Sequence, residues 1–204
     1  MSGLPRIVEL ARLLVARTLS GGDFAIDATV GNGHDTLWLA RQVGSTGRVL
    51  GLDVQSVALR AARRRLAEAG VTDRVLLVRA GHERIDHVLA RDGSTTRPKV
   101  VMFNLGYLPG GDHFIATRPE STIVAIEATL ARVVPGGLVT VVAYPGHAVG
   151  QSESNALREW IVSLSRDRLN LLRCDLPNTM QPAPWLLAFS PESGFRNRFS
   201  GDQT

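Results

Sequence analysis

Apolar runs of strand length alternate with helical patterns from residue 24 to residue 143, and this alternation constrains the fold more than any other feature. The apolar runs cover residues 24–28, 49–52, 75–78, 100–103 and 138–143, and helical patterns occupy 35–43, 56–69, 83–91 and 119–134. Strands joined through helices form right-handed crossovers in a parallel sheet that helices cover on both faces. The alternation therefore predicts an α/β fold of the Rossmann-like kind, built on a mainly parallel sheet.

The segments on either side complete this expected architecture. Residues 4–19 carry apolar positions at helical spacing, and Gly21-Gly22 ends that pattern. Residues 151–166 predict a last helix, and the runs 169–176 and 185–189 follow with no helix between them, which predicts an antiparallel edge pair and seven strands in all. We expect one domain over residues 1–190 and a flexible tail over 191–204.

Composition excludes several classes of protein. The sequence has no apolar stretch near the ~20 residues that a membrane-spanning helix needs. Arg6, Arg12 and Arg17 interrupt any apolar core of a secretion signal, so a cytoplasmic location is the default expectation. Cys174 is the sole cysteine, and the five histidines show no metal-ligand spacing. Neither an intramolecular disulfide nor a metal site is expected.

A formal net charge of +4 leaves two interpretations open. Partners that carry phosphate groups bind basic proteins preferentially, but a basic helix face commonly has no role beyond contact with solvent. The clearest cluster lies on the expected helix over residues 56–69 and consists of Arg60, Arg63, Arg64 and Arg65.

The loop after the first strand carries the first functional signal. Gly31 and Gly33 allow the backbone to approach a ligand closely, and the next helix presents unpaired amides at its start. Asp27 would repel a pyrophosphate, and Thr36 replaces the third glycine of the dinucleotide fingerprint. Asp27 could instead accept from an ammonium group, while loop amides and the hydroxyl of Thr29 or Thr36 receive a carboxylate. The loop therefore predicts S-adenosylmethionine rather than a nicotinamide dinucleotide.

The next two strand ends supply the rest of the expected nucleoside pocket. Asp53 follows the second strand and could accept hydrogen bonds from both ribose hydroxyls, with Gln55 close enough to assist. Gly81 or His82, after the third strand, is the expected adenine contact. Taken singly, Asp27 and Asp53 are more typical of a cap or turn, and the glycines of an ordinary tight turn. Their order and spacing together favour the cofactor pocket.

The fourth strand ends in Asn104-Leu105-Gly106-Tyr107, which resembles the Asn-Pro-Pro-Tyr tetrapeptide of amino-directed methyltransferases. The side-chain carbonyl of Asn104 and the backbone carbonyl of Leu105 could orient the N–H bonds of a nitrogen nucleophile. Tyr107 could stack on a base or close the pocket. The alternative is a glycine-rich turn with an asparagine cap and a packed tyrosine.

An alkylamine nucleophile must also lose a proton before it accepts a methyl group. The sequence offers Asp35, Asp112, His113 and His147 as proton acceptors and does not rank them. His147 follows the fifth strand, where a histidine could act in proton transfer. An ordinary loop histidine is an equally good interpretation.

These motifs together resemble the bacterial tRNA 5-aminomethyl-2-thiouridine methyltransferases, a family also labelled rRNA methylases. The resembling blocks cover residues 22–40, 53–55, 81–83, 104–112, 126–127 and 144–147. The resemblance implies a class I, S-adenosylmethionine-dependent enzyme that methylates the aminomethyl group of a wobble 2-thiouridine. It also implies a homodimer that binds the anticodon arm of tRNA.

Carried over residue by residue, the resemblance assigns two groups of side chains. The cofactor group is Asp27, Asn32, His34, Asp35, Asp53, Gln55 and His82. The substrate group is Asn104, Tyr107, Tyr144 and His147, to which our interpretation of the loops adds Leu105, Gly106, His113 and Asn178.

The chain departs from the family pattern at three places that we expect to face substrate. His113 stands where a lysine is usual, an acidic stretch is reduced to residues 151–153, and the loop over 178–184 fits the pattern loosely. Two other functions therefore stay open: methylation of an amine on rRNA or a small molecule, and a non-catalytic module that binds the cofactor and RNA.

Overall fold

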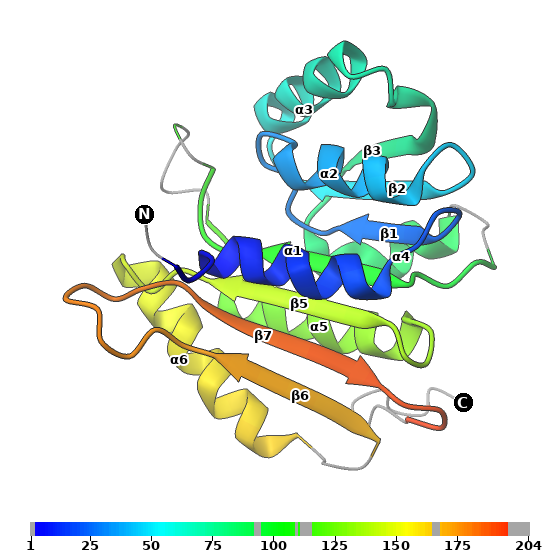
Figure 1. The fold of residues 1–204 in the computed structure, drawn as a ribbon. Coiled ribbons are helices and arrows are strands. Elements are labelled where there is room, and N and C mark those ends of the chain that lie inside the picture. Colours follow the sequence, from blue (N-terminus) through cyan, green and yellow to red (C-terminus); the bar gives the residue numbers. More distant parts are fainter. Residues whose placement is uncertain (1–2, 92–94, 109, 111–115, 165–167, 196–204) are drawn as a thin grey trace.

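The computed structural model describes residues 3–91, 95–108, 110, 116–164 and 168–195. Seven strands form one sheet in the order β3-β2-β1-β4-β5-β7-β6 (Figure 1). The strands are β1 (Phe24–Asp27), β2 (Arg48–Asp53), β3 (Val75–Arg79), β4 (Val100–Asn104), β5 (Leu138–Ala143), β6 (Leu169–Cys174) and β7 (Trp185–Pro191). All neighbours pair in parallel except β7, which is antiparallel to both β5 and β6.

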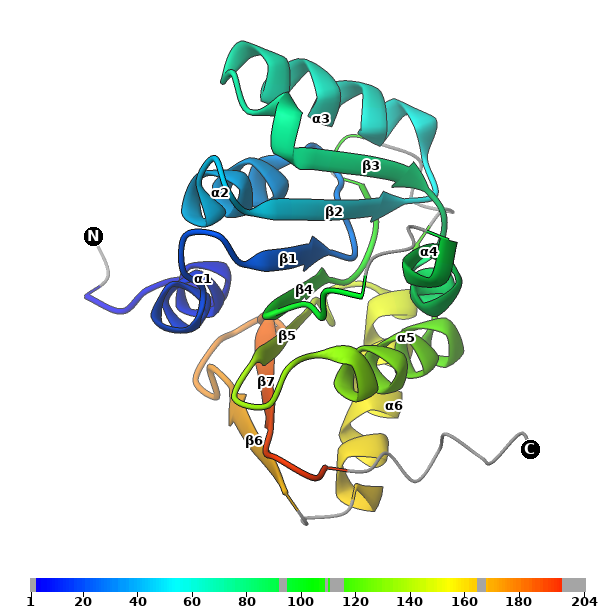
Figure 2. The same ribbon diagram turned by 90° about the vertical axis from the view of Figure 1, so that its right-hand side faces the viewer.

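Helices cover both faces of this sheet (Figure 2). One face carries α1 (Ile7–Thr18), α2 (His34–Val43) and α3 (Ser56–Glu68), and the other carries α4 (Ile85–Arg91), α5 (Pro119–Arg132) and α6 (Ala148–Ser163). Two short 3-10 helices, η1 (Thr72–Arg74) and η2 (His82–Arg84), flank β3. The chain order reverses between β1 and β4, and ligands in open α/β sheets bind at such switch points.

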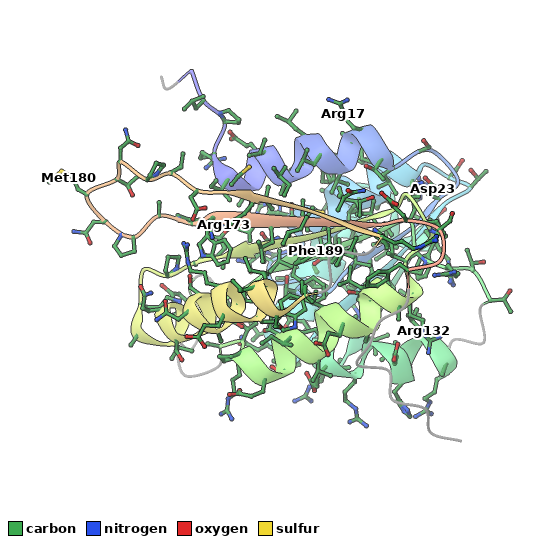
Figure 3. The ribbon with its side chains drawn as sticks, turned by 90° about the horizontal axis from the view of Figure 1, so that it is seen from below. Arg17, Asp23, Arg132, Arg173, Met180 and Phe189 are labelled. Carbon is green, nitrogen blue, oxygen red and sulfur yellow. The ribbon has the colours of Figure 1, made fainter. Side chains whose placement is uncertain are left out.

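The core consists of side chains that point from the strands into these two helix layers. Phe103 and Phe189 are buried against the α4–α6 layer, and the ring of Trp160 from α6 lies 5.7 Å from that of Phe189 (Figure 3). Leu39 and Val43 of α2 pack on the opposite face. Since the central strands are covered on both sides, their near-continuous apolar sequence is what a buried parallel sheet requires.

The predicted fold class, the seven strands and the antiparallel edge pair are confirmed. Element ends differ by up to three residues: α1 starts at Ile7 rather than at residue 4, and α6 starts at Ala148 rather than at residue 151. His147 caps this helix, because its Nδ1 atom accepts the Gly150 N–H at 3.0 Å. Histidine is not among the usual N-cap residues, so the sequence pattern placed the start too late.

The first residues of the expected tail, 191–195, belong to the described structure. Pro191 still belongs to β7, and the partly buried Phe195 packs against the core. Residues 196–204 lie outside the described residues, so the rest of the tail prediction stays a prediction. Among the described helices, none is long and apolar enough to cross a membrane.

Candidate functional site

A cavity of about 850 Å³ opens at the carboxyl ends of β1, β2, β3 and β4, at the switch point of the sheet. This volume is typical of a small-molecule site. We call the wall formed by residues 28–35, 52–55 and 80–83 the glycine-loop wall, and the wall formed by residues 104–108 and 144–147 the Asn104 wall. The predicted residues that line the cavity are Thr29, Gly31, Asn32, His34, Asp35, Asp53, Gln55, Gly81, His82, Asn104, Leu105, Gly106, Tyr107, Tyr144 and His147.

Asp53 organises the glycine-loop wall. Its Oδ2 atom accepts the Gly31 N–H and its Oδ1 atom accepts the Gln55 N–H, both at 2.8 Å. Each carboxylate oxygen has a further lone pair, and the side chain lines the cavity. Asp53 is therefore held in place by backbone donors and can still accept from a pair of ligand hydroxyls.

Asp27 differs from its predicted role, because it is fully buried and does not line the cavity. Its Oδ2 atom accepts the Thr36 hydroxyl at 2.5 Å and its Oδ1 atom accepts the Thr29 N–H at 3.2 Å. Burial, assisted by the negative charge of Asp35, raises the pKa of Asp27 to about 7. Asp27 and Thr36 thus lie beneath the loop and support it, and neither side chain lines the cavity.

Gly33 also serves a purpose other than the predicted one. It caps α2 with a φ of 78°, and a Cβ atom there would lie 2.7 Å from the Cα and Cβ of Ala62 on α3. Glycine is needed here for helix packing and for the left-handed backbone, not for ligand approach. Gly31, with a φ of 51°, is the loop glycine that does line the cavity.

His82 closes the far end of the glycine-loop wall, next to Gly81. It is 6% exposed, and burial lowers the pKa of its imidazole. Its Nε2 atom lies 3.4 Å from the hydroxyl oxygen of Thr122. A largely neutral imidazole with one edge on the cavity fits the predicted contact with an uncharged base.

Asn104 is the central residue of the Asn104 wall. Its Nδ2 atom donates to Asp35 Oδ2 at 2.7 Å, and its backbone N–H donates to the Thr29 hydroxyl at 2.7 Å. Its Oδ1 atom is buried and has no hydrogen-bond partner among the described residues. Leaving a buried acceptor unpaired costs roughly 1–3 kcal/mol, so this oxygen is a strong candidate to receive a ligand N–H or O–H.

His147 presents a donor to the cavity. Because a backbone N–H can only donate, the Gly150 bond to Nδ1 places the proton of the neutral ring on Nε2. The rings of His147 and Tyr107 lie 5.0 Å apart in a tilted arrangement. Tyr144 lines the same wall, and burial, with the charge of Asp35, raises its pKa.

Two of the four predicted proton acceptors can thus be assessed. Asp35 accepts from Asn104 and is ion-paired with Arg12, whose Nη2 lies 2.6 Å from Asp35 Oδ1. The basic nitrogen of His147 is already engaged by Gly150. This geometry favours roles other than proton acceptor for both residues. Asp112 and His113 lie outside the described residues, and their roles stay predictions.

The sequence interpretation missed a buried carboxyl group behind the Asn104 wall. Glu153 is 2% exposed, and its two oxygens accept the hydroxyls of Thr117 and Thr122, both at 2.6 Å. Burial raises the pKa of Glu153. Thr117 Oγ1 in turn accepts the Gly106 N–H at 2.8 Å. Glu153 therefore holds the loop after β4 and does not line the cavity, although residues 151–153 were expected to face substrate.

Helix α1 contributes further residues that the sequence did not suggest, since Val8 and Arg12 line the cavity. Asn178 is exposed and does not line it, although Pro182 and Pro184 of the same loop do. The tip of this loop, at Met180, projects away from the sheet (Figure 3). No group of three or more metal-ligating side chains occurs within the described ranges.

The donors and acceptors of the cavity fit a nucleoside that carries an anionic group. Asp53 provides a carboxylate for paired hydroxyls, and the start of α2, at His34, presents helix N-terminal amides to an anionic group. No cluster of basic side chains for a pyrophosphate lines the glycine-loop wall.

Comparison with known proteins agrees with this interpretation. A putative rRNA methylase from Clostridium thermocellum has a crystal structure with a TM-score of 0.88 and 35% identity, over 93% of this chain and 100% of that one. A putative methyltransferase from Streptococcus mutans, solved in complex with SAH, has a TM-score of 0.81 and 28% identity, over 92% and 99% of the two chains. The fold and site define the class of S-adenosylmethionine-dependent methyltransferases.

The particular family follows from the sequence. The profile of the family described as "Putative rRNA methylase" matches residues 49–190, and the chain belongs to this family. A curated relative, the chloroplastic tRNA (mnm(5)s(2)U34)-methyltransferase of Arabidopsis thaliana, is 34% identical over 159 residues, which is 74% of this chain. The chain spans 57% of the length of that relative.

Proposed function

We propose that this protein transfers a methyl group from S-adenosylmethionine to the amino nitrogen of 5-aminomethyl-2-thiouridine at the wobble position of tRNA. The observation that carries the proposal is the buried Asn104 Oδ1, which has no partner among the described residues. An oxygen that can only accept suits a nucleophile that keeps an N–H bond, as a primary amine does. The name of the Arabidopsis relative supports the same wobble nucleoside.

The glycine-loop wall would hold the donor. Asp53 would accept from the ribose hydroxyls, His82 and Gly81 would contact the adenine, and the amides at the start of α2 would receive the carboxylate. When bound, S-adenosylmethionine supplies an electrophilic methyl group.

The Asn104 wall would hold the acceptor. Asn104 Oδ1 and the Leu105 carbonyl orient the amine, while Tyr107 and His147 contact the base, with His147 Nε2 as a donor. The neutral amine is the reactive form, and its alignment against the donor can supply ~7–11 kcal/mol of the barrier. The proton acceptor is proposed to be Asp112 or His113.

Mass spectrometry of tRNA nucleosides tests this proposal. We expect tRNA that bears 5-aminomethyl-2-thiouridine to gain one methyl group on that nucleoside after incubation with the protein and S-adenosylmethionine. The same tRNA with unmodified uridine at the wobble position should gain none. Methylation of rRNA in place of this tRNA, or no methylation of either, would contradict the proposal.

The proposal also includes three features that the resemblance implies: binding of the anticodon arm, a homodimer, and a cytoplasmic location. Sedimentation of the purified protein alone and with an anticodon-arm RNA measures the first two. A monomer that binds the RNA with full activity would contradict the homodimer.

A further inference from the structure

Three side chains from distant parts of the chain form a continuous hydrogen-bonded series beside the cavity. Arg12 of α1 donates from Nε to Asp35 Oδ1 at 2.7 Å, and its Nη2 lies 2.6 Å from the same oxygen. Asp35, in the first turn of α2, accepts the Asn104 Nδ2 at 2.7 Å through its other oxygen. Arg12, Asp35 and Asn104 all line the cavity.

This series determines which end of the Asn104 amide is available to a ligand. With Asp35 Oδ2 opposite Nδ2, the carbonyl Oδ1 is the end left without a partner among the described residues. A flipped amide would place Oδ1 against the carboxylate, where two acceptors repel each other. The guanidinium of Arg12 in turn restricts the carboxylate, because both Nε and Nη2 approach Oδ1.

We propose that Arg12 and Asp35 are positioning residues, which fix the Asn104 amide so that its carbonyl oxygen accepts from the nucleophilic nitrogen. The inference rests on the proposed function for the identity of that nitrogen. It changes the role of Asp35, which was expected to contact the cofactor or to accept a proton.

The two side chains of the ion pair differ in burial. The side chain of Arg12 is 32% exposed and that of Asp35 is 13% exposed. Removing Arg12 leaves the mostly buried Asp35 carboxylate without its cation, so Arg12→Gln should cost some stability as well as turnover.

The first test measures kinetics on tRNA that bears the aminomethyl nucleoside. Asp35→Asn keeps the size of the side chain but accommodates either orientation of the Asn104 amide, so kcat should fall about tenfold. Arg12→Gln should lower kcat by several-fold, with Arg12→Lys between it and the wild type because lysine restores only the charge. The KM for tRNA and the affinity for SAH should change less than about twofold.

Arg17→Gln is the matched control, since Arg17 lies on the same helix and points away from the sheet (Figure 3). It should leave all these quantities unchanged. A double-mutant cycle then separates positioning from general damage: in an Asn104→Ala background, Asp35→Asn should cause almost no further loss of kcat. Additive losses, or a loss of SAH affinity that matches the loss of kcat, would overturn the inference.

A second measurement does not depend on activity. The side-chain amide signal of Asn104, assigned in NMR spectra through its absence in Asn104→Ala, should show slow hydrogen exchange in the wild type and fast exchange in Asp35→Asn. If the wild type methylates no tRNA, the proposed function fails while this comparison still decides whether Asp35 fixes the amide. Unchanged exchange in Asp35→Asn would overturn the inference on its own.

Discussion

The two walls of the cavity differ in how their polar atoms are satisfied. In the glycine-loop wall, two backbone amides hold Asp53: that of Gln55, two residues away, and that of Gly31, 22 residues away. In the Asn104 wall, the central residue depends on Asp35, which is 69 residues distant, and keeps one acceptor without a partner among the described residues. A wall whose carboxylate is held by backbone amides suits a constant ligand, and a wall with an unpaired acceptor suits the group that reacts.

The largest expected effect comes from breaking the Asn104 wall. Asn104→Ala removes the acceptor that orients the nucleophile, and we expect kcat to fall on the order of 100-fold, because small misplacements of reacting groups cost this much. Steady-state kinetics with modified tRNA measures the loss. Calorimetry with SAH should show donor affinity within about twofold of the wild type, since the residues of the glycine-loop wall are intact. A matching loss of donor affinity would show that Asn104 belongs functionally to both walls.

The converse change breaks the glycine-loop wall. Asp53→Ala removes a charged acceptor and releases the Gly31 and Gln55 amides, so SAH affinity should fall roughly 10- to 100-fold. Asp53→Asn, which keeps one acceptor, should lose less. Turnover at saturating donor should stay within about threefold. Asp73→Ala, which alters an exposed carboxylate in η1, is the control for charge. Equal binding by Asp53→Ala and wild type would refute the assignment.

The contrast between the walls also explains what the sequence could reveal. The order of strands and helices was predictable because apolar spacing and glycine stops are local signals. The position of Asp53 at the end of β2 was predictable for the same reason. Arg12 and Glu153 were missed because their partners are Asp35 and Thr117, 23 and 36 residues away. Nothing in a single sequence marks such pairs.

Asp27 shows a different limit of the sequence. A carboxylate at a strand end is typical of a ligand contact, and burial alone separates that role from a supporting one. The sequence gives no sign that the Thr36 hydroxyl and the Thr29 amide would satisfy Asp27 beneath the loop. The loop lines the cavity, but the division of its residues between lining and support required the structure.

The pH dependence of the unfolding free energy should test whether Asp27 supports the loop or contacts a ligand. The pKa of Asp27 is raised to about 7 in the folded protein, so the folded state binds a proton that the unfolded state releases. Its contribution to stability is fully present below the unfolded pKa of ~3.9 and is lost as pH rises through about 7. Relative to Asp27→Asn, the wild type should lose about 1.4 kcal/mol of unfolding free energy from about pH 6 to about pH 8.

Urea unfolding of the wild type and of Asp27→Asn across this pH range measures the difference in unfolding free energy. Taking the difference between the two proteins cancels the contributions of all other titrating groups. A pH-independent difference would mean that Asp27 is ionised throughout. It would then carry a buried negative charge under the loop, and a direct role toward a ligand ammonium would regain support.

The smallest expected effect concerns the outside of the glycine-loop wall. Arg65 of α3 is not a surface residue of the expected kind, because its Nε donates to the Asn32 carbonyl at 2.9 Å and so holds the loop. The exposed basic residues of this helix are Arg60, Arg63 and Arg64. Replacing these three with glutamine should weaken tRNA binding by several-fold and lower the magnitude of the salt slope by about 2, if they contact phosphates.

Binding titrations over a series of salt concentrations measure this slope. The matched control replaces three exposed arginines on other helices, Arg17, Arg41 and Arg91, which removes the same total charge. An equal change in both triple variants would mean that only net charge matters, and an unchanged slope in the α3 variant would make this face merely solvated. A change in the slope confined to the α3 variant would instead show that the outer surface of the glycine-loop wall binds RNA. Both walls would then contact the tRNA, although they bind chemically different ligands within the cavity.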